Sequence, residues 1–93
     1  MYLKEQTYVC ALAEQGNMTQ AAAKLFISQP ALSAYIKCVE DRLGSPLFVR
    51  KDGRFVLTFL GERYVDRARK MLELQDLFNL EMSLIQRGDQ GRV

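Results

Sequence analysis

The sequence predicts a mainly α-helical fold in which three short helices and a two-stranded β-hairpin precede one long helix. Apolar residues at helical spacing are divided into short runs by Gly16 and Gly44, and an Asp-Gly pair at residues 52–53 joins two β-prone runs. An uninterrupted helical pattern then fills most of the remaining chain. With 93 residues, of which 48% are hydrophobic, the chain fits one domain with a modest core.

The first two helices are indicated by their amphipathic spacing and by the residues at their ends. Apolar residues recur every three or four positions from Tyr2 to Gln15, and Gly16 is a typical left-handed stop. Asn17 is a good cap for a second, alanine-rich helix, which we expect to continue to about Phe26.

The third helix has different chemistry on its two faces. Ser28 is a good N-cap, Pro30 fits the first turn, and Gly44 ends the helix. One face carries an apolar stripe that we expect to contact the core, formed by Leu32, Ile36, Val39 and Leu43. The opposite face is small, polar and basic near its start, whereas Glu40 and Asp41 lie near its end. Because free N–H groups and the positive end of the helix dipole attract anions, the amino end suits a phosphate backbone.

The hairpin that follows is basic. Two helices joined by a short turn, the second with a small polar outer face, are typical of a helix-turn-helix, and the hairpin would be its β wing. The wing gathers Arg50, Lys51 and Arg54 against the single Asp52. Such a ribbon can reach a flanking minor groove or a phosphate. The net charge of only +2 does not by itself indicate a nucleic-acid partner. The prediction that this winged helix-turn-helix contacts DNA therefore depends on the local cluster of basic residues.

The long helix is predicted from Phe59, after a Thr58 cap, to about Arg87, which makes it roughly 43 Å long at 1.5 Å per residue. One face shows seven- and four-residue spacing and indicates a packing seam that we expect a second copy of the chain to cover: Tyr64, Ala68, Met71, Gln75, Phe78, Met82 and Ile85. Three leucines project from the opposite side, namely Leu77, Leu80 and Leu84. We expect these leucines to face either a further domain or another part of the dimer.

Several motifs together resemble one family. The run GNMTQAAAKLFISQPALSAYIKCVEDRLGSPLFVRKDGRFVLTFLG is similar to the N-terminal winged helix-turn-helix of LysR-type transcriptional regulators. That family's signature combines an alanine pair, SQPALS, LE-x-x-LG-x-PLF-x-R and LT-x-x-G. The corresponding residues here are Ala21 to Ala23, Ser28 to Ser33, Val39 to Arg50, and Leu57 and Thr58 with Gly61.

The resemblance implies a division of labour along the chain. Residues 1–58 would form the DNA-binding domain, 59–88 a linker and dimerisation helix paired antiparallel with a second copy, and 89–93 the start of a connection to an effector-binding domain that lies outside these residues. It also implies a dimer or tetramer and a small-molecule effector that binds only through that further domain. Two third helices would enter successive major grooves of a pseudo-palindromic double-stranded DNA site.

The family's base and backbone contacts map onto the start of the third helix and the wing. They fall on Ser28, Gln29, Pro30, Ser33, Ala34, Lys37, Arg50 and Arg54, and we add Lys51 from the charge of the wing. Thr19 and Gln20 are further candidates for a phosphate, although capping and solvation explain them equally well. Because Ala34 stands where many members carry a long polar side chain, we expect part of the specificity to come from DNA shape.

Other functional classes are disfavoured. The chain has no histidine, its two cysteines Cys10 and Cys38 are far apart, and no carboxylate pair suggests a catalytic cleft, so we expect no enzyme, metal or cofactor. Neither a signal peptide nor a membrane span is indicated, which favours the cytoplasm and no membrane partner. The rival interpretation is a winged-helix module that dimerises or binds proteins without binding DNA.

Overall fold

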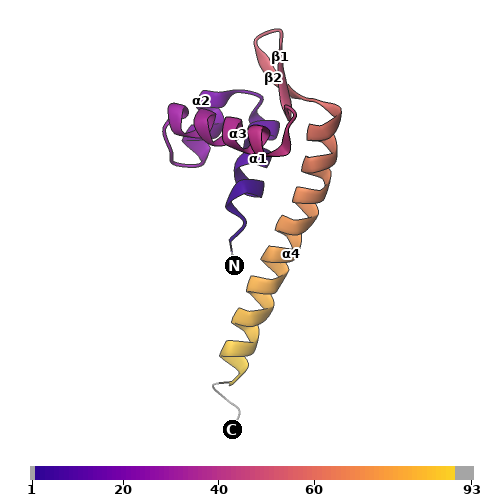
Figure 1. The fold of residues 1–93 in the computed structure, drawn as a ribbon. Coiled ribbons are helices and arrows are strands. Elements are labelled where there is room, and N and C mark those ends of the chain that lie inside the picture. Colours follow the sequence, from indigo (N-terminus) through magenta and orange to yellow (C-terminus); the bar gives the residue numbers. More distant parts are fainter. Residues whose placement is uncertain (1, 90–93) are drawn as a thin grey trace.

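The computed structural model describes residues 2–89 and has the predicted mainly α-helical architecture. Three short helices and a hairpin cluster at one end of a long helix, which continues well past them (Figure 1). In chain order the elements are α1 (Lys4–Gln15), α2 (Met18–Lys24), α3 (Gln29–Leu43), β1 (Phe48–Lys51), β2 (Arg54–Leu57) and α4 (Phe59–Asp89). The connection predicted at 89–93 lies outside the described residues, apart from the backbone of Asp89.

Local capping explains most of the helix boundaries. Gly16 ends α1 in the left-handed conformation, and the Asn17 side chain accepts a hydrogen bond from the N–H of Gln20 at the start of α2. Ser28 caps α3 by accepting from the N–H of Ala31, and Thr58 caps α4 by accepting from the N–H of Gly61. These caps fix the short connections between the first three helices, and therefore their packing.

Two predicted boundaries differ from the structure. Helix α1 begins at Lys4 rather than Tyr2. Helix α2 ends at Lys24, before the predicted Phe26, because Phe26 adopts a positive φ of 60° and turns the chain toward α3. Its side chain is 95% exposed, so it contributes nothing to the core.

The wing is a two-stranded antiparallel hairpin with the predicted two-residue turn. Asp52 and Gly53 both have positive φ, 53° and 76°, as a tight hairpin of right-handed twist requires. The register pairs Lys51 with Arg54 next to the turn and Phe48 with Leu57 at the other end. The hairpin returns directly to α4, where a Cβ added to Gly61 would collide with the backbone carbonyl of Leu47. Glycine in the LT-x-x-G motif therefore permits this close approach.

The hydrophobic core lies where α1, α2, α3, the hairpin and the first turns of α4 meet. Its most buried large side chains are Val9, Leu12, Leu32 and Leu47. The predicted apolar stripe of α3 is confirmed for Leu32, Ile36 and Val39 but is wrong for Leu43, which is 39% exposed. Leu43 is the last residue of α3, one turn past Val39, and it is not part of the buried core cluster.

The first half of α4 belongs to this core. Val65 and Ala68 are buried, and the backbone N–H of Leu3 donates to the Gln75 side chain at 2.6 Å. The hydroxyl of Tyr64 donates to Glu5 Oε2 at 2.6 Å. Within the described residues, no helix combines the length and hydropathy that a membrane crossing requires.

Candidate nucleic-acid interface

The amino end of α3 is open to solvent. The residues predicted there to contact DNA are all exposed: Ser28, Gln29, Pro30, Ser33, Ala34 and Lys37. Ser28 is extended and its hydroxyl oxygen accepts from the N–H of Ala31 at 3.2 Å, while Pro30 occupies the first turn. This end therefore presents small side chains, one lysine and the positive end of the helix dipole, a combination that favours an approaching anion.

The start of α2 lies beside this surface in the fold. The side chains of Thr19 and Gln20 are exposed, and the N–H of Gln20 donates to Asn17 Oδ1 at 2.9 Å. The cap of α2 is therefore the Asn17 side chain, and the exposed side chains of Thr19 and Gln20 can be reached from solvent.

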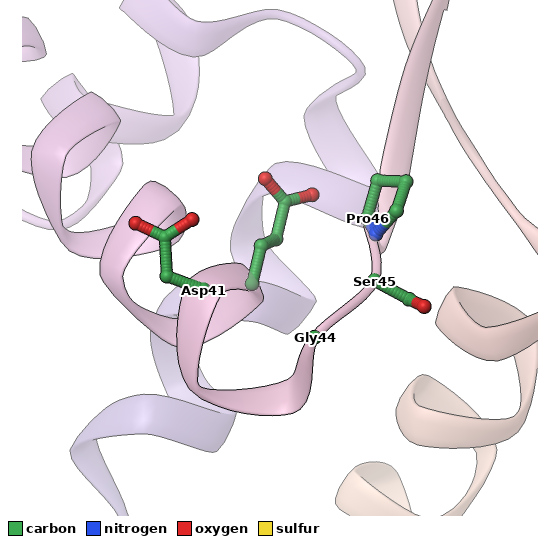
Figure 2. Close-up of a pocket in the computed structure, with 5 residues that line it drawn as sticks. Asp41, Gly44, Ser45 and Pro46 are labelled. Atoms are coloured by element: carbon green, nitrogen blue, oxygen red, sulfur yellow. The ribbon is translucent and has the colours of Figure 1, made fainter.

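The carboxyl end of α3 has a different role. Oε2 of Glu40 accepts hydrogen bonds from the backbone N–H groups of Leu47 and Phe48, at 2.7 and 3.2 Å. The Glu40 carboxylate thereby holds the start of β1 beside α3. Asp41 remains exposed and lies 3.7 Å from Lys37, a solvent-screened pair that contributes little. Figure 2 shows Asp41 with Gly44, Ser45 and Pro46 around the shallow depression at this acidic end.

The three basic side chains of the wing do not share one environment. Arg50 and Lys51 are exposed, and the guanidinium of Arg50 stacks on the ring of Phe55, 4.5 Å from its centroid. Arg54 is turned the other way, since its Nη2 donates to the carbonyl oxygen of Gln15 at 3.3 Å. Only two of the predicted wing residues therefore lie free of the helical body.

A groove of about 200 Å³ separates α3 from the hairpin. Ser33 and Lys37 contribute its polar wall, and Phe48 and Phe55 line the side of the strands. The groove therefore lies between the middle of α3 and the strands of the hairpin, with Met18 of α2 also lining it.

The seven residues of the predicted α4 seam are divided between two environments. Ala68 and Gln75 are buried within the chain, and Tyr64 is half-buried with its hydroxyl bonded to Glu5 of α1. The other four are between 43% and 46% exposed: Met71, Phe78, Met82 and Ile85. The leucines on the other side are exposed too, namely Leu77, Leu80 and Leu84. The last three residues of the predicted seam, Phe78, Met82 and Ile85, are therefore all exposed in this chain.

Contacts that the sequence did not reveal join α1 to α3 and α4. Glu5 pairs with Arg42 of α3 and also accepts the hydrogen bond from Tyr64 of α4. Burial, followed by that hydrogen bond, raises the pKa of Tyr64 above its usual range. The rings of Tyr8 and Tyr35 pack with centroids 4.8 Å apart, beneath the ammonium of Lys4. Apart from Lys4 and Tyr8, which are one helical turn apart, these partners are 27 to 59 positions apart in the chain, so no local pattern indicates them.

The two cysteines are free thiols in different environments. Cys10 is buried in the core, and this burial raises the pKa of its thiol. Cys38 is exposed on α3. The raised pKa and the burial of Cys10 disfavour a reactive thiolate at that position.

Comparisons with known proteins agree with this arrangement. Residues 3–62 match the family model of bacterial regulatory helix-turn-helix proteins of the lysR family. The chain is 37% identical over 91 residues to the transcriptional regulator XapR of Escherichia coli, covering 98% of this chain and 31% of XapR. It is 39% identical over 93 residues to BudR of Klebsiella aerogenes, covering 100% of this chain and 65% of BudR. This chain therefore spans about a third of XapR and about two thirds of BudR.

Solved structures give the same result. The chain superposes on the BenM_DBD/benA site 1 DNA complex with a TM-score of 0.86 and 33% identity, covering 95% of this chain and 99% of that one. It superposes on the CbnR_DBD–DNA complex with a TM-score of 0.80 and 31% identity, covering 92% and 99%. Given the family match over residues 3–62 and these superpositions, the chain belongs to the LysR family of bacterial helix-turn-helix regulatory proteins.

Proposed function

We propose that this chain is the sequence-specific DNA-binding portion of a dimeric bacterial transcription regulator. Helix α3 would lie in the major groove, and the wing would contact the flanking minor groove or backbone. The observation that carries the proposal is the asymmetry of α3. Its amino end is exposed, whereas the Glu40 carboxylate at the other end is occupied by the N–H groups of Leu47 and Phe48.

The contacts divide into those that position and those that specify. Thr19, Gln20, Arg50 and Lys51 are suited to phosphates, which supply most of the affinity and make it depend on salt. The start of α3 reads bases through Ser28, Gln29, Pro30, Ser33, Ala34 and Lys37. Because few of these side chains are long, DNA shape contributes to the specificity.

Pairing of two chains would present two α3 helices to one pseudo-palindromic site. The exposed apolar side chains of α4 support this pairing, in particular Met71 and, further along the helix, Phe78, Met82 and Ile85. Residues 1–58 act on DNA and 59–88 on the partner, although the core of the fold spans both through Val65 and Ala68. Half-sites about 34–36 Å apart, or a multiple of that spacing, would suit such a dimer.

The remaining assignments follow from family membership and from length. Since XapR is about three times as long as this chain, a small-molecule effector would act through a region outside these 93 residues, and that region would also set any tetramer. A transcription regulator of this kind would act in the cytoplasm, by binding DNA and not by catalysis.

A titration of a generic DNA duplex at two salt concentrations tests this function. Affinity is expected to fall at least about tenfold between 50 and 200 mM salt, because several phosphate contacts release counterions. Arg50→Ala should weaken binding to every sequence and reduce the salt slope by about 0.9, while Ser33→Ala should lose about 1–3 kcal/mol at one operator position only.

Arg87→Ala is the matched control, since Arg87 lies in the last turn of α4, far from the wing (Figure 1). It should leave both affinity and slope unchanged. Absence of salt-sensitive binding at 50 mM would instead favour a module that binds proteins.

A further inference from the structure

The start of β2 is bound to the end of α1. The guanidinium of Arg54 donates to the carbonyl oxygen of Gln15, the last residue of α1, and the N–H of Phe55 donates to the carbonyl oxygen of Gly16 at 2.9 Å. The carbonyl groups at a helix carboxyl end lack partners within the helix and carry partial negative charge. A guanidinium is therefore a favourable partner at this position, and it joins the wing to the helical body.

Gly16 is shaped for the same contact. It adopts a positive φ of 64°, which ends α1, and a Cβ at this position would lie 2.9 Å from the guanidinium carbon of Arg54 and closer still to Nη2. Any side chain at Gly16 would therefore displace the Arg54 guanidinium. The glycine thus serves two purposes, since it permits the backbone turn and leaves room for Arg54.

The neighbouring basic residues of the hairpin make no such contact with α1. Lys51 pairs with Arg54 across the ladder, both residues are exposed, and Arg50 stacks on Phe55. Arg50 and Lys51 are thus placed to meet a phosphate, whereas the charge of Arg54 already faces the carbonyl groups of α1.

We propose that Arg54 is a positioning residue, which fixes the wing relative to α3 by binding the carboxyl end of α1 and does not itself neutralise a phosphate. The inference rests on the proposed DNA-binding function and departs from the contact that the family resemblance implies for this position. Without Arg54, the bound protein would still contact the same phosphates, so the number of released counterions, and with it the salt slope, is unchanged. The hairpin would first have to be ordered on binding, and this cost lowers the affinity.

Salt-dependent titration of a generic duplex separates positioning from phosphate contact. Arg54→Ala and Arg54→Lys should each weaken binding about 3- to 10-fold, the cost of ordering a loosened segment, with the salt slope of the wild type. Lysine keeps the charge but lacks the planar fork of the guanidinium, so it should not rescue. Lys51→Ala, which removes an equal charge from the paired position, serves as the reference for the loss of one phosphate contact.

Two results would overturn the assignment. One is a slope reduced by about 0.9 in Arg54→Ala, which is the signature of a lost phosphate contact. The other is wild-type affinity in either Arg54 variant.

Hydrogen exchange at the Phe55 amide, measured in the DNA-free chain, provides a readout independent of DNA. Exchange should be faster in Arg54→Ala than in the wild type, because the Arg54 side chain holds β2 against the end of α1 beside the Phe55 amide. Lys51→Ala should not accelerate exchange, since of these two side chains it is Arg54 that makes this contact. Unchanged exchange in Arg54→Ala would overturn the inference. If the wild type failed to bind DNA at all, the proposed function would be lost, and the exchange measurement would still decide whether Arg54 holds the wing.

Discussion

The two halves of α4 share one continuous helix but have different surroundings. In the first half, Val65 and Ala68 are buried in the core and Gln75 accepts the hydrogen bond from Leu3. In the second half, Phe78 is 44% exposed and Leu80 is 56% exposed, although both are large and apolar. The first half completes the fold of one chain, whereas the second half extends beyond it (Figure 1).

This difference indicates that the helix serves two structural purposes. A helical segment without tertiary contacts is marginally stable in water, and exposed leucine and phenylalanine side chains favour association. The stability of a single chain should therefore depend on the first half, while the association of two chains should depend on the second.

The largest effect is expected from a charge placed in the first half. Ala68→Glu would bury a carboxylate against α1 without a partner, and should lower the free energy of unfolding by about 3–5 kcal/mol. The same substitution type in the second half, Leu80→Glu, should change it by no more than about 0.5 kcal/mol, because that position is exposed. Urea unfolding of dilute, monomeric protein measures both. Equal destabilisation by the two variants would remove the distinction between the halves.

A smaller but specific effect is expected on the association of two chains. Phe78→Ala should raise the dimer dissociation constant about 30-fold or more, as truncation of a central aromatic residue commonly costs at least 2 kcal/mol. The unfolding of the monomer should be unaffected. Sedimentation equilibrium measures the dissociation constant, and Arg87→Ala is a suitable control on the same helix. A dimer as tight as that of the wild type would place the interface elsewhere.

The smallest effect concerns the contact between Tyr64 and Glu5. Because burial and this hydrogen bond raise the pKa of Tyr64, its neutral form is favoured in the folded chain. Its contribution is therefore fully present below the unfolded pKa of about 10 and is lost as pH rises above that value. Tyr64→Phe should lower stability by about 1 kcal/mol at pH 7 and make the decline above pH 10 shallower.

Tyr2→Phe provides the matched control, since Tyr2 is exposed. It should change the free energy of unfolding at pH 7 by no more than about 0.5 kcal/mol, as is usual for an exposed side chain. A Tyr64→Phe curve parallel to that of the wild type up to pH 11 would contradict the role given to the phenol.

The parts of the fold that depend on local chemistry could be predicted from the sequence. Asn17, Ser28 and Thr58 cap their helices through atoms three residues away, and Asp52 with Gly53 forms a turn that few other pairs adopt. Capping and turn preferences act over such short distances, so the sequence displays them directly. The exposed start of α3 could be predicted because the apolar stripe fixed which face is buried.

Contacts between distant segments could not be predicted in this way. Nothing near Arg54 indicates that its guanidinium binds Gln15, and nothing near Gln75 indicates the N–H of Leu3. The seven-residue spacing in α4 described one continuous seam, yet α1 covers part of it, because a heptad pattern does not distinguish a helix of the same chain from that of a partner. The exposed position of Leu43 has the same origin, since the position of a residue on a helix face does not show how far the core extends.

The hydrogen bonds of Glu40 to Leu47 and Phe48 bear on any attempt to retarget this protein to a new operator. Positions 33, 34 and 37 can be varied in a library because their side chains support no other element. Position 40 lies about one turn further along the same helix and could be chosen for such a library. Its carboxylate, however, holds the start of the hairpin through Leu47 and Phe48. A library that randomises it would discard many useful variants through a displaced wing, so Glu40 is best kept constant.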